Sequence, residues 1–115
     1  MDIPQTIENF FEMKNGHDYD GIVSLFADDA VVVDAGEGKT LRGNEEINAW
    51  VRKSIAGLDL HTEIQDSKKI KNEWIVDTVM TGNFKASPAS FQYFITLDGD
   101  KISALRVEFR GSLKK

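Results

Sequence analysis

Asp34 is the residue of this sequence that is best placed for acid–base chemistry. It follows the β-branched run Val31–Val33, which favours a strand, so its carboxylate stands at the end of a buried strand. Such a carboxylate is costly unless it is hydrogen-bonded, paired or partly hydrated. Two interpretations stay open. Asp34 is either a general base whose pKa is raised by desolvation in an apolar pocket, or a strand-end acid bound by water or by the amides of the Gly36–Gly38 loop.

Asp77 is a second carboxylate and interrupts the apolar segment Trp74–Met80. Because neighbouring strand residues point to opposite faces, Asp77 shares a face with Ile75 and Val79. If that face looks into a cavity, Asp77 is a second internal acid, and two close carboxylates could share a proton. If it looks outward, Asp77 is a solubilising charge, and the Trp74 face is core or dimer interface. Base rates favour the outward orientation.

The sequence predicts neither a metal site nor a bound cofactor. His17 and His61 are isolated and lack an HxxxH-type spacing. The chain has no cysteine, which excludes disulfides, thiolate nucleophiles and cysteine-based zinc sites. The Gly36–Gly38 loop is too short to indicate phosphate binding. We therefore expect chemistry, if present, that requires no cofactor.

Composition indicates one soluble globular domain, spanning residues 1–115. Hydrophobic residues make up 41% of the chain and charged residues 29%, which argues against disorder. The net charge of -5 is spread along the chain, so nucleic-acid binding is not expected. No apolar run reaches the length of a membrane span, and the N-terminus lacks the pattern of a signal peptide. With the lack of cysteine, these features fit a cytoplasmic protein.

Two helices are expected before the first strand. Pro4 suits the first helical position, Gly16 ends this helix, and Asp18 is a plausible N-cap for a second, short helix. Asp28 and Asp29 suit the end of the second helix and the turn after it. The apolar faces consist of Ile3, Ile7, Phe10 and Phe11 in the first helix and of Ile22, Leu25 and Phe26 in the second.

A third helix is predicted after the glycine-rich loop, capped by Asn44 and ended by Gly57. From Leu58 onward the apolar period changes to two, which predicts a run of antiparallel strands. The whole order predicts an α+β fold in which a strongly curved sheet wraps around the helices. The expected strands are Asp59–Ser67, Glu73–Thr81, Ala89–Leu97 and Lys101–Arg110, with turns at Lys68–Asn72, Gly82-Asn83 and Asp98-Gly99.

The segment Phe26–Asp34, FADDAVVVD, is followed by the glycine-rich loop, by Leu41-Arg42-Gly43 and by a helix carrying Ile47 and Trp50. This pattern resembles the nuclear transport factor 2-like superfamily and, within it, the branch of ketosteroid isomerases and SnoaL-like polyketide cyclases. The resemblance covers almost the whole chain. It implies a cone-shaped, curved antiparallel sheet wrapped around three N-terminal helices, a cystatin-like α+β barrel, with a ligand cavity inside and a homodimer as the common assembly.

The resemblance also implies site residues. Asp34 occupies the position of the catalytic base of the isomerases, whereas Phe10 falls where they have a tyrosine donor and Gln92 where they have a protonated aspartate. Phe10 has no hydrogen bond to give; the Gln92 amide could donate to an oxyanion or could be a polar residue on the wet face of its strand. One lost oxyanion donor typically costs about 100-fold to 1000-fold in rate, which argues against a true steroid isomerase. Expected ligand-binding residues are Phe10, Phe26, Trp50, Ile75, Phe94, Leu105 and Phe109.

Two functions follow from these expectations. In the first, a small apolar or polyketide-like carbonyl ligand enters the cavity, and an isomerase or cyclase moves a proton with Asp34 as general base and Gln92 as anchor. In the second, the domain is a non-catalytic module that binds a ligand or forms a homodimer through the outer face of the sheet. An open cavity at Asp34 favours the first function, and a cavity plugged by side chains favours the second.

Overall fold

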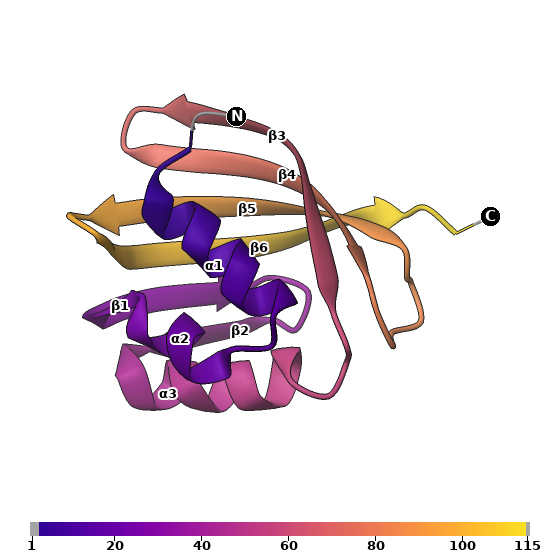
Figure 1. The fold of residues 1–115 in the computed structure, drawn as a ribbon, viewed down its shortest axis with the longest axis horizontal. Helices are drawn as coiled ribbons and strands as arrows, with labels where there is room; N and C mark the ends of the chain where they lie inside the picture. Colours follow the sequence, from indigo (N-terminus) through magenta and orange to yellow (C-terminus); the bar gives the residue numbers. More distant parts are fainter. Residues whose placement is uncertain (1–2, 115) are drawn as a thin grey trace.

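The computed structural model describes residues 3–114 and has the expected α+β architecture, with helices and a curved, unclosed sheet of six strands (Figure 1). Within these residues, no helix has the length and apolar character needed to cross a membrane. The helices are α1 (Gln5–Asn15), α2 (Tyr19–Ser24) and α3 (Gly43–Trp50), which continues as the π-helical turn η1 (Val51–Ile55). The strands are β1 (Phe26–Asp34), β2 (Lys39–Arg42), β3 (His61–Ile70), β4 (Glu73–Thr81), β5 (Ala89–Asp98) and β6 (Lys101–Ser112).

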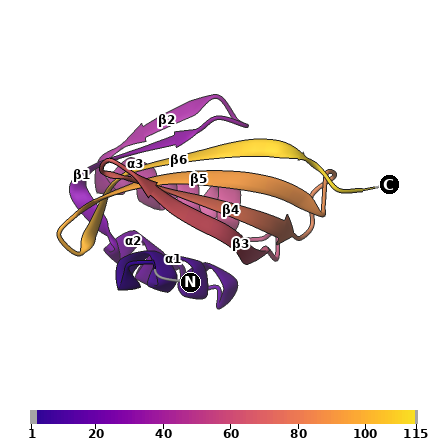
Figure 2. The same ribbon diagram turned by 90° about the horizontal axis from the view of Figure 1, so that it is seen from above.

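The strands lie in the order β2-β1-β6-β5-β4-β3. All neighbours are antiparallel except β1 and β6, which run parallel; α3 and four strands lie between these two along the chain. Figure 2 shows the sheet arching over α1 and α2. The core fills the space under this arch, and its largest buried side chains come from all three helices and from the strands, including Phe10, Ile22, Ile47 and Tyr93.

The two faces of the sheet are set by strand parity. In β4, Val76, Thr78 and Met80 are buried, whereas Ile75 and Asp77 lie on the opposite face and are only half-buried. The sequence left two orientations of Asp77 open, and the structure has the outward one. The Asp77 carboxylate accepts a hydrogen bond of 2.8 Å from the Gln92 amide of the adjacent strand.

The first half of the chain departs from expectation between Phe26 and Arg42. Asp28 and Asp29 do not end α2, because the strand already begins at Phe26 and contains both residues, which are exposed. The short strand β2 was not expected either. It pairs only with the last residues of β1, at the edge of the sheet, and its sequence KTLR offers little apolar pattern.

The ends of several other elements also differ from the sequence predictions. Gly43 begins α3, and Asn44 does not cap it: the Asn44 amide donates to Asp28 and the backbone N–H of Arg42 donates to Glu46. Strand β3 runs to Ile70, so the turn that was predicted at Lys68–Asn72 contains only residues 71 and 72. Residues 82–88 connect β4 to β5, a longer link than the predicted Gly82-Asn83 turn.

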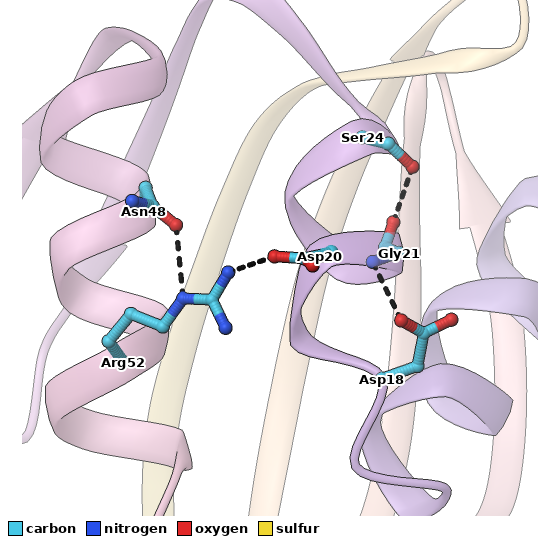
Figure 3. Close-up of polar contacts among 6 residues, drawn as sticks. All are labelled: Asp18, Asp20, Gly21, Ser24, Asn48 and Arg52. Atoms are coloured by element: carbon cyan, nitrogen blue, oxygen red, sulfur yellow. Dashed lines mark hydrogen bonds and ion pairs between the residues drawn. The ribbon is translucent and has the colours of Figure 1, made fainter.

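Polar contacts fix α2 against the helix formed by α3 and η1 (Figure 3). As predicted, Asp18 caps α2, where its side chain accepts a hydrogen bond of 2.9 Å from the Gly21 amide. The Arg52 guanidinium pairs with Asp20 of α2 and donates at 3.2 Å to Asn48, one turn earlier on its own helix. These exposed contacts orient the helices, whereas buried Ile22 and Ile47 contribute the apolar packing.

The last residue of α1 ties this helix to the sheet. The Asn15 side chain donates at 2.8 Å to the carbonyl of Thr62 and accepts at 2.7 Å from the Thr62 amide. Asn15 thus satisfies both backbone groups of a residue near the start of β3. Because α1 carries Phe10 and Lys14, this contact also determines where those side chains lie.

We expect Asn15→Ala to lower the free energy of unfolding by about 2 kcal/mol, because it removes two partly buried hydrogen bonds and leaves backbone groups unpaired. Asn9→Ala is the matched control in the same helix. It removes only an exposed contact with Gln5 and should change stability by less than about 0.5 kcal/mol. Urea unfolding of the two variants measures both values; equal losses would contradict the anchoring role of Asn15.

Candidate active site

A cavity of about 380 Å³ lies under the sheet and contains the strongest candidates for chemistry. Its walls come from α1, α3 with η1, and the inner face of the sheet, and they are mostly apolar. The polar side chains among them are few: Lys14, Asp34, Glu37, Ser54 and Tyr93. The other lining residues are Phe10, Gly36, Trp50, Ile55, Leu58, Leu60, Met80, Phe84, Phe91, Val107 and Phe109.

The cavity has an exposed end and a buried end. Phe109 is 46% exposed although it lines the cavity, and Gly36 and Glu37 are exposed beside it in the β1–β2 loop, so these residues mark the mouth. At the other end, Phe10 and Lys14 are 0% and 2% exposed. A ligand that enters past Phe109 therefore moves from a wet rim toward a dry interior.

Asp34 is held in the wall by two donors. The indole N–H of Trp50 donates to Oδ2 at 3.0 Å, and the backbone N–H of Glu37 donates to Oδ1 at 3.3 Å. A carboxylate can accept about four hydrogen bonds, so part of its capacity is left for a ligand. Trp50 lies on the buried face of α3, and Glu37 lies in the loop after β1. Asp34 is therefore oriented only when the end of β1, this loop and α3 pack together.

The pKa of Asp34 is raised above its ordinary value. Partial burial in the apolar wall is the main cause, and the neighbouring Glu37 adds to it, while the hydrogen bond from Trp50 opposes both. The pKa of Glu37 moves the other way, chiefly because the Ser54 hydroxyl donates to its carboxylate at 2.7 Å. The two acids thus titrate as a pair in which Asp34 holds the proton more strongly.

Lys14 is a further ionisable group of the cavity, and its side chain is almost completely buried. Its Nζ donates at 2.6 Å to the Thr62 hydroxyl and lies 3.8 Å from the sulfur of Met80. No carboxylate of residues 3–114 forms an ion pair with it. Burial therefore lowers the pKa of Lys14 from 10.5 to about 7.

Tyr93 completes the polar part of the cavity. Burial and the nearby charge of Asp34 raise the pKa of its phenol, and a hydrogen bond with Thr62 acts in the opposite direction. Tyr93 therefore stays protonated at neutral pH and can only donate or accept a hydrogen bond. Phe10 and Phe11 pack edge-on against its ring, at centroid distances of 6.1 and 5.0 Å, and hold it in place.

The structure brings together some of the expected site residues. Asp34, Phe10, Trp50 and Phe109 all line the cavity. Phe26 and Leu105 are buried in the core but do not line it; Phe26 instead borders a separate hollow of about 740 Å³ next to α3.

Gln92, Ile75 and Phe94 lie on the outer face of the sheet, away from the cavity. Gln92 is opposite Asp77 in the strand register and donates to it, and Phe94 is opposite Ile75 and packs under the Arg106 guanidinium at 4.1 Å. Parity explains the placement: Phe91 and Tyr93 line the cavity, so the residues between and after them point outward. Gln92 therefore does not face Asp34.

Lys14, Tyr93 and Glu37 are cavity residues that the sequence analysis did not select. A signal for Lys14 is present, because it follows Ile7 and Phe10 by seven and four positions and so shares their buried helix face. For Tyr93 the signal is its alternation with Gln92. The sequence carries no signal for Glu37, since the position of this residue depends on the loop conformation.

Among residues 3–114, no group of three or more His, Cys, Asp or Glu side chains could hold a metal ion.

Comparison with known proteins identifies the family of this chain. The family model described as SnoaL-like domain matches residues 7–107, which include every polar residue of the cavity. The chain belongs to the SnoaL-like domain family. Among curated proteins, none matches the sequence.

Solved structures resemble this SnoaL-like domain over nearly its full length. A Sinorhizobium meliloti protein named "putative polyketide cyclase" is 27% identical, with a TM-score of 0.86, and the match covers 94% of this chain and 97% of that one. A Catenulispora acidiphila protein with a ketosteroid isomerase-like fold, solved in complex with trimethylamine, is 20% identical, with a TM-score of 0.81 and coverage of 93% and 86%. An uncharacterised cystatin-fold protein from Novosphingobium aromaticivorans is also 20% identical, with a TM-score of 0.77 and coverage of 90% and 95%.

The contacts of Asp34 predict how its pKa responds to substitution. Trp50→Phe removes the donor that stabilises the ionised form, so we expect the pKa of Asp34 to rise further. Glu37→Gln removes a neighbouring negative charge and should lower it. Carbon-13 NMR titration of the Asp34 carboxyl measures both, with Glu45→Gln at an exposed site as the control. Shifts in the same direction for both variants would contradict this account.

Lys14 predicts an unusual dependence of stability on pH. Its pKa is about 7 in the folded chain and about 10.5 when unfolded, so the unfolded chain binds more protons between these values. Stability should therefore rise with pH in this range, and Lys14→Met should abolish that contribution. Between pH 6 and pH 10 we expect wild type to gain about 4 kcal/mol relative to Lys14→Met in urea unfolding. Lys101→Met, at an exposed site, should show no such difference; a pH-independent gap for Lys14→Met would refute the lowered pKa.

Proposed function

We propose that this SnoaL-like domain binds a small apolar or polyketide-like carbonyl compound in its cavity and transfers a proton with Asp34 as general base. The observation that carries the proposal is the position of Asp34: a carboxylate with a raised pKa and free acceptor capacity, in the wall of an open apolar cavity. A raised pKa makes the carboxylate a stronger base.

The proposed step is removal of a proton from the carbon next to the carbonyl group. The electrons of the C–H bond then move toward the carbonyl oxygen, which needs a hydrogen-bond donor. The protonated phenol of Tyr93 lines the same cavity and supplies this donor in place of Gln92, which lies outside. Return of the proton to another carbon gives an isomerase, and attack of the enolate on a second carbonyl gives a cyclase. The step requires no cofactor.

The ligand class follows from the walls. Phe10, Trp50, Phe91 and Phe109 offer apolar and aromatic surface, which suits a cyclic compound with few charges. A volume of about 380 Å³ suits a compound of one or a few rings. The membership in the SnoaL-like family and the similarity to the Sinorhizobium protein support a polyketide-like ligand.

Deuterium exchange tests the general base. A cyclic ketone such as 2-tetralone, dissolved in D₂O with the protein, should lose its α-protons faster than in buffer, and Asp34→Asn should reduce the acceleration by about 100-fold to 10,000-fold. Asp29→Asn, an exposed carboxylate of the same strand, is the control and should keep full activity. An Asp34→Asn protein that matches wild type with every ketone that binds would overturn the assignment.

A homodimerisation module remains the second candidate, and the outer face of the sheet favours it. Ile75, Phe94 and Arg106 form one row across three strands, next to a row made by Asp77, Gln92 and Glu108. The apolar side chains of the first row are only half-buried in the single chain. If no ketone binds and sedimentation shows a dimer, this candidate replaces the first. The expected cytoplasmic location stays a prediction under either.

A further inference from the structure

Lys14 is a buried amine that the proposed proton transfer leaves unused. Its side chain is 2% exposed, lines the cavity, and is directed by α1 toward β3 and β4. The partners of Nζ are a hydroxyl of Thr62 and the thioether of Met80, and both are neutral. A buried ammonium normally has a carboxylate beside it, because an unpaired charge in an apolar site is costly. Here the surroundings favour the uncharged amine.

An uncharged lysine amine is a nucleophile. With a pKa of about 7, roughly half of the Lys14 side chains are unprotonated at neutral pH, whereas only about one in a few thousand ordinary lysines is. The charged groups that share the cavity are Asp34 and Glu37, both at its outer part, and the phenol of Tyr93 stays neutral. The hydroxyl of Thr62 holds Nζ in place without taking its proton.

We propose that Lys14 forms an imine with an aldehyde or ketone bound in the cavity. This inference rests on the proposed function in one respect, that the cavity accepts carbonyl compounds. The Nζ lone pair forms a bond to the carbonyl carbon, and the π electrons of the C=O bond move to oxygen, giving a carbinolamine. Nitrogen then loses its protons to the departing oxygen, the C–O bond breaks, and water leaves. Amine and carbonyl thus give imine and water, with no oxidant, reductant or net change in protons.

The imine would act together with Asp34. A proton taken up from solvent converts the neutral imine into an iminium ion. This ion withdraws electrons from the neighbouring carbon more strongly than the parent carbonyl does, so the same carboxylate removes the α-proton more easily. The product of that step is an enamine. Lys14 would then be a catalytic residue that activates the carbonyl covalently, in a cavity where Phe10 provides no hydrogen-bond donor.

Reductive trapping tests the proposal on the wild-type protein. The protein is incubated at pH 7 with 2-tetralone, or with benzaldehyde as a second probe, and with sodium cyanoborohydride, which reduces imines to stable amines. Peptide mass spectrometry then locates the adducts. We expect Lys14 to be labelled at least ten times faster than the exposed Lys101, and an excess of unreactive cyclic alcohol of similar shape to slow the labelling of Lys14 alone. Labelling of Lys14 no faster than of Lys101 would overturn the proposal.

Variants separate this proposal from the general-base proposal. Lys14→Arg and Lys14→Met should both lose the cavity adduct, while Lys101→Met should keep it. Asp34→Asn should keep the adduct but lose α-proton exchange. Ketone binding with exchange that depends on Asp34, but without an adduct, would refute the amine chemistry and leave the general base standing. An adduct without exchange in wild type would support Lys14 and refute the role of Asp34.

Discussion

The contacts of Thr62 are the interaction on which the rest of the site depends. Both of its backbone groups bind the Asn15 side chain, its hydroxyl accepts from Lys14, and the same hydroxyl is hydrogen-bonded to Tyr93. One residue of β3 thus joins the end of α1 to two polar groups of the cavity. Because Asn15 and Lys14 are neighbours, the contact fixes both the position of the helix and its rotation. Phe10, one turn earlier, is carried into the cavity as a result.

The apolar walls then determine the ionisation of the two groups that could do chemistry. Desolvation raises the pKa of Asp34 and lowers that of Lys14, so each is displaced toward its uncharged form. An ion pair between them would cancel both effects, and none forms between these two side chains in the structure. The acid lies toward the mouth and the amine at the buried end, so a ligand in the cavity has a base and a nucleophile at different positions.

Much of the fold could be predicted from local patterns and from the family resemblance, and so could four residues of the cavity wall, namely Phe10, Asp34, Trp50 and Phe109. The apolar periods of α1 and of β4–β6, together with the resemblance of Phe26–Asp34 to a known family, were enough for the α+β class and for the position of Asp34 on its strand. Phe91 and Tyr93 form the inner face of β5. If that face had been assigned from these two residues, strand parity would have placed Gln92 on the outer face. β2 was not predicted because an edge strand of four mostly polar residues shows little of the apolar alternation that identifies a strand. Lys14 was not predicted as a cavity residue because lysine side chains are rarely buried, even at positions on an apolar helix face.

The position of α1 in the structure shows what changes when residue 10 is a phenylalanine. The resemblance implies a tyrosine donor there, and a phenylalanine removes that hydrogen bond while keeping the ring that packs against Tyr93. The next turn of the same helix face carries Lys14, whose amine reaches the same cavity from a position four residues later. A hydroxyl donor stabilises charge on a carbonyl oxygen, whereas an amine can replace that oxygen altogether. The phenylalanine at position 10 therefore removes one hydrogen-bond donor, while Tyr93 keeps a donor in the cavity. Under our proposal, Lys14 adds a second means of activating a carbonyl, which is a covalent bond.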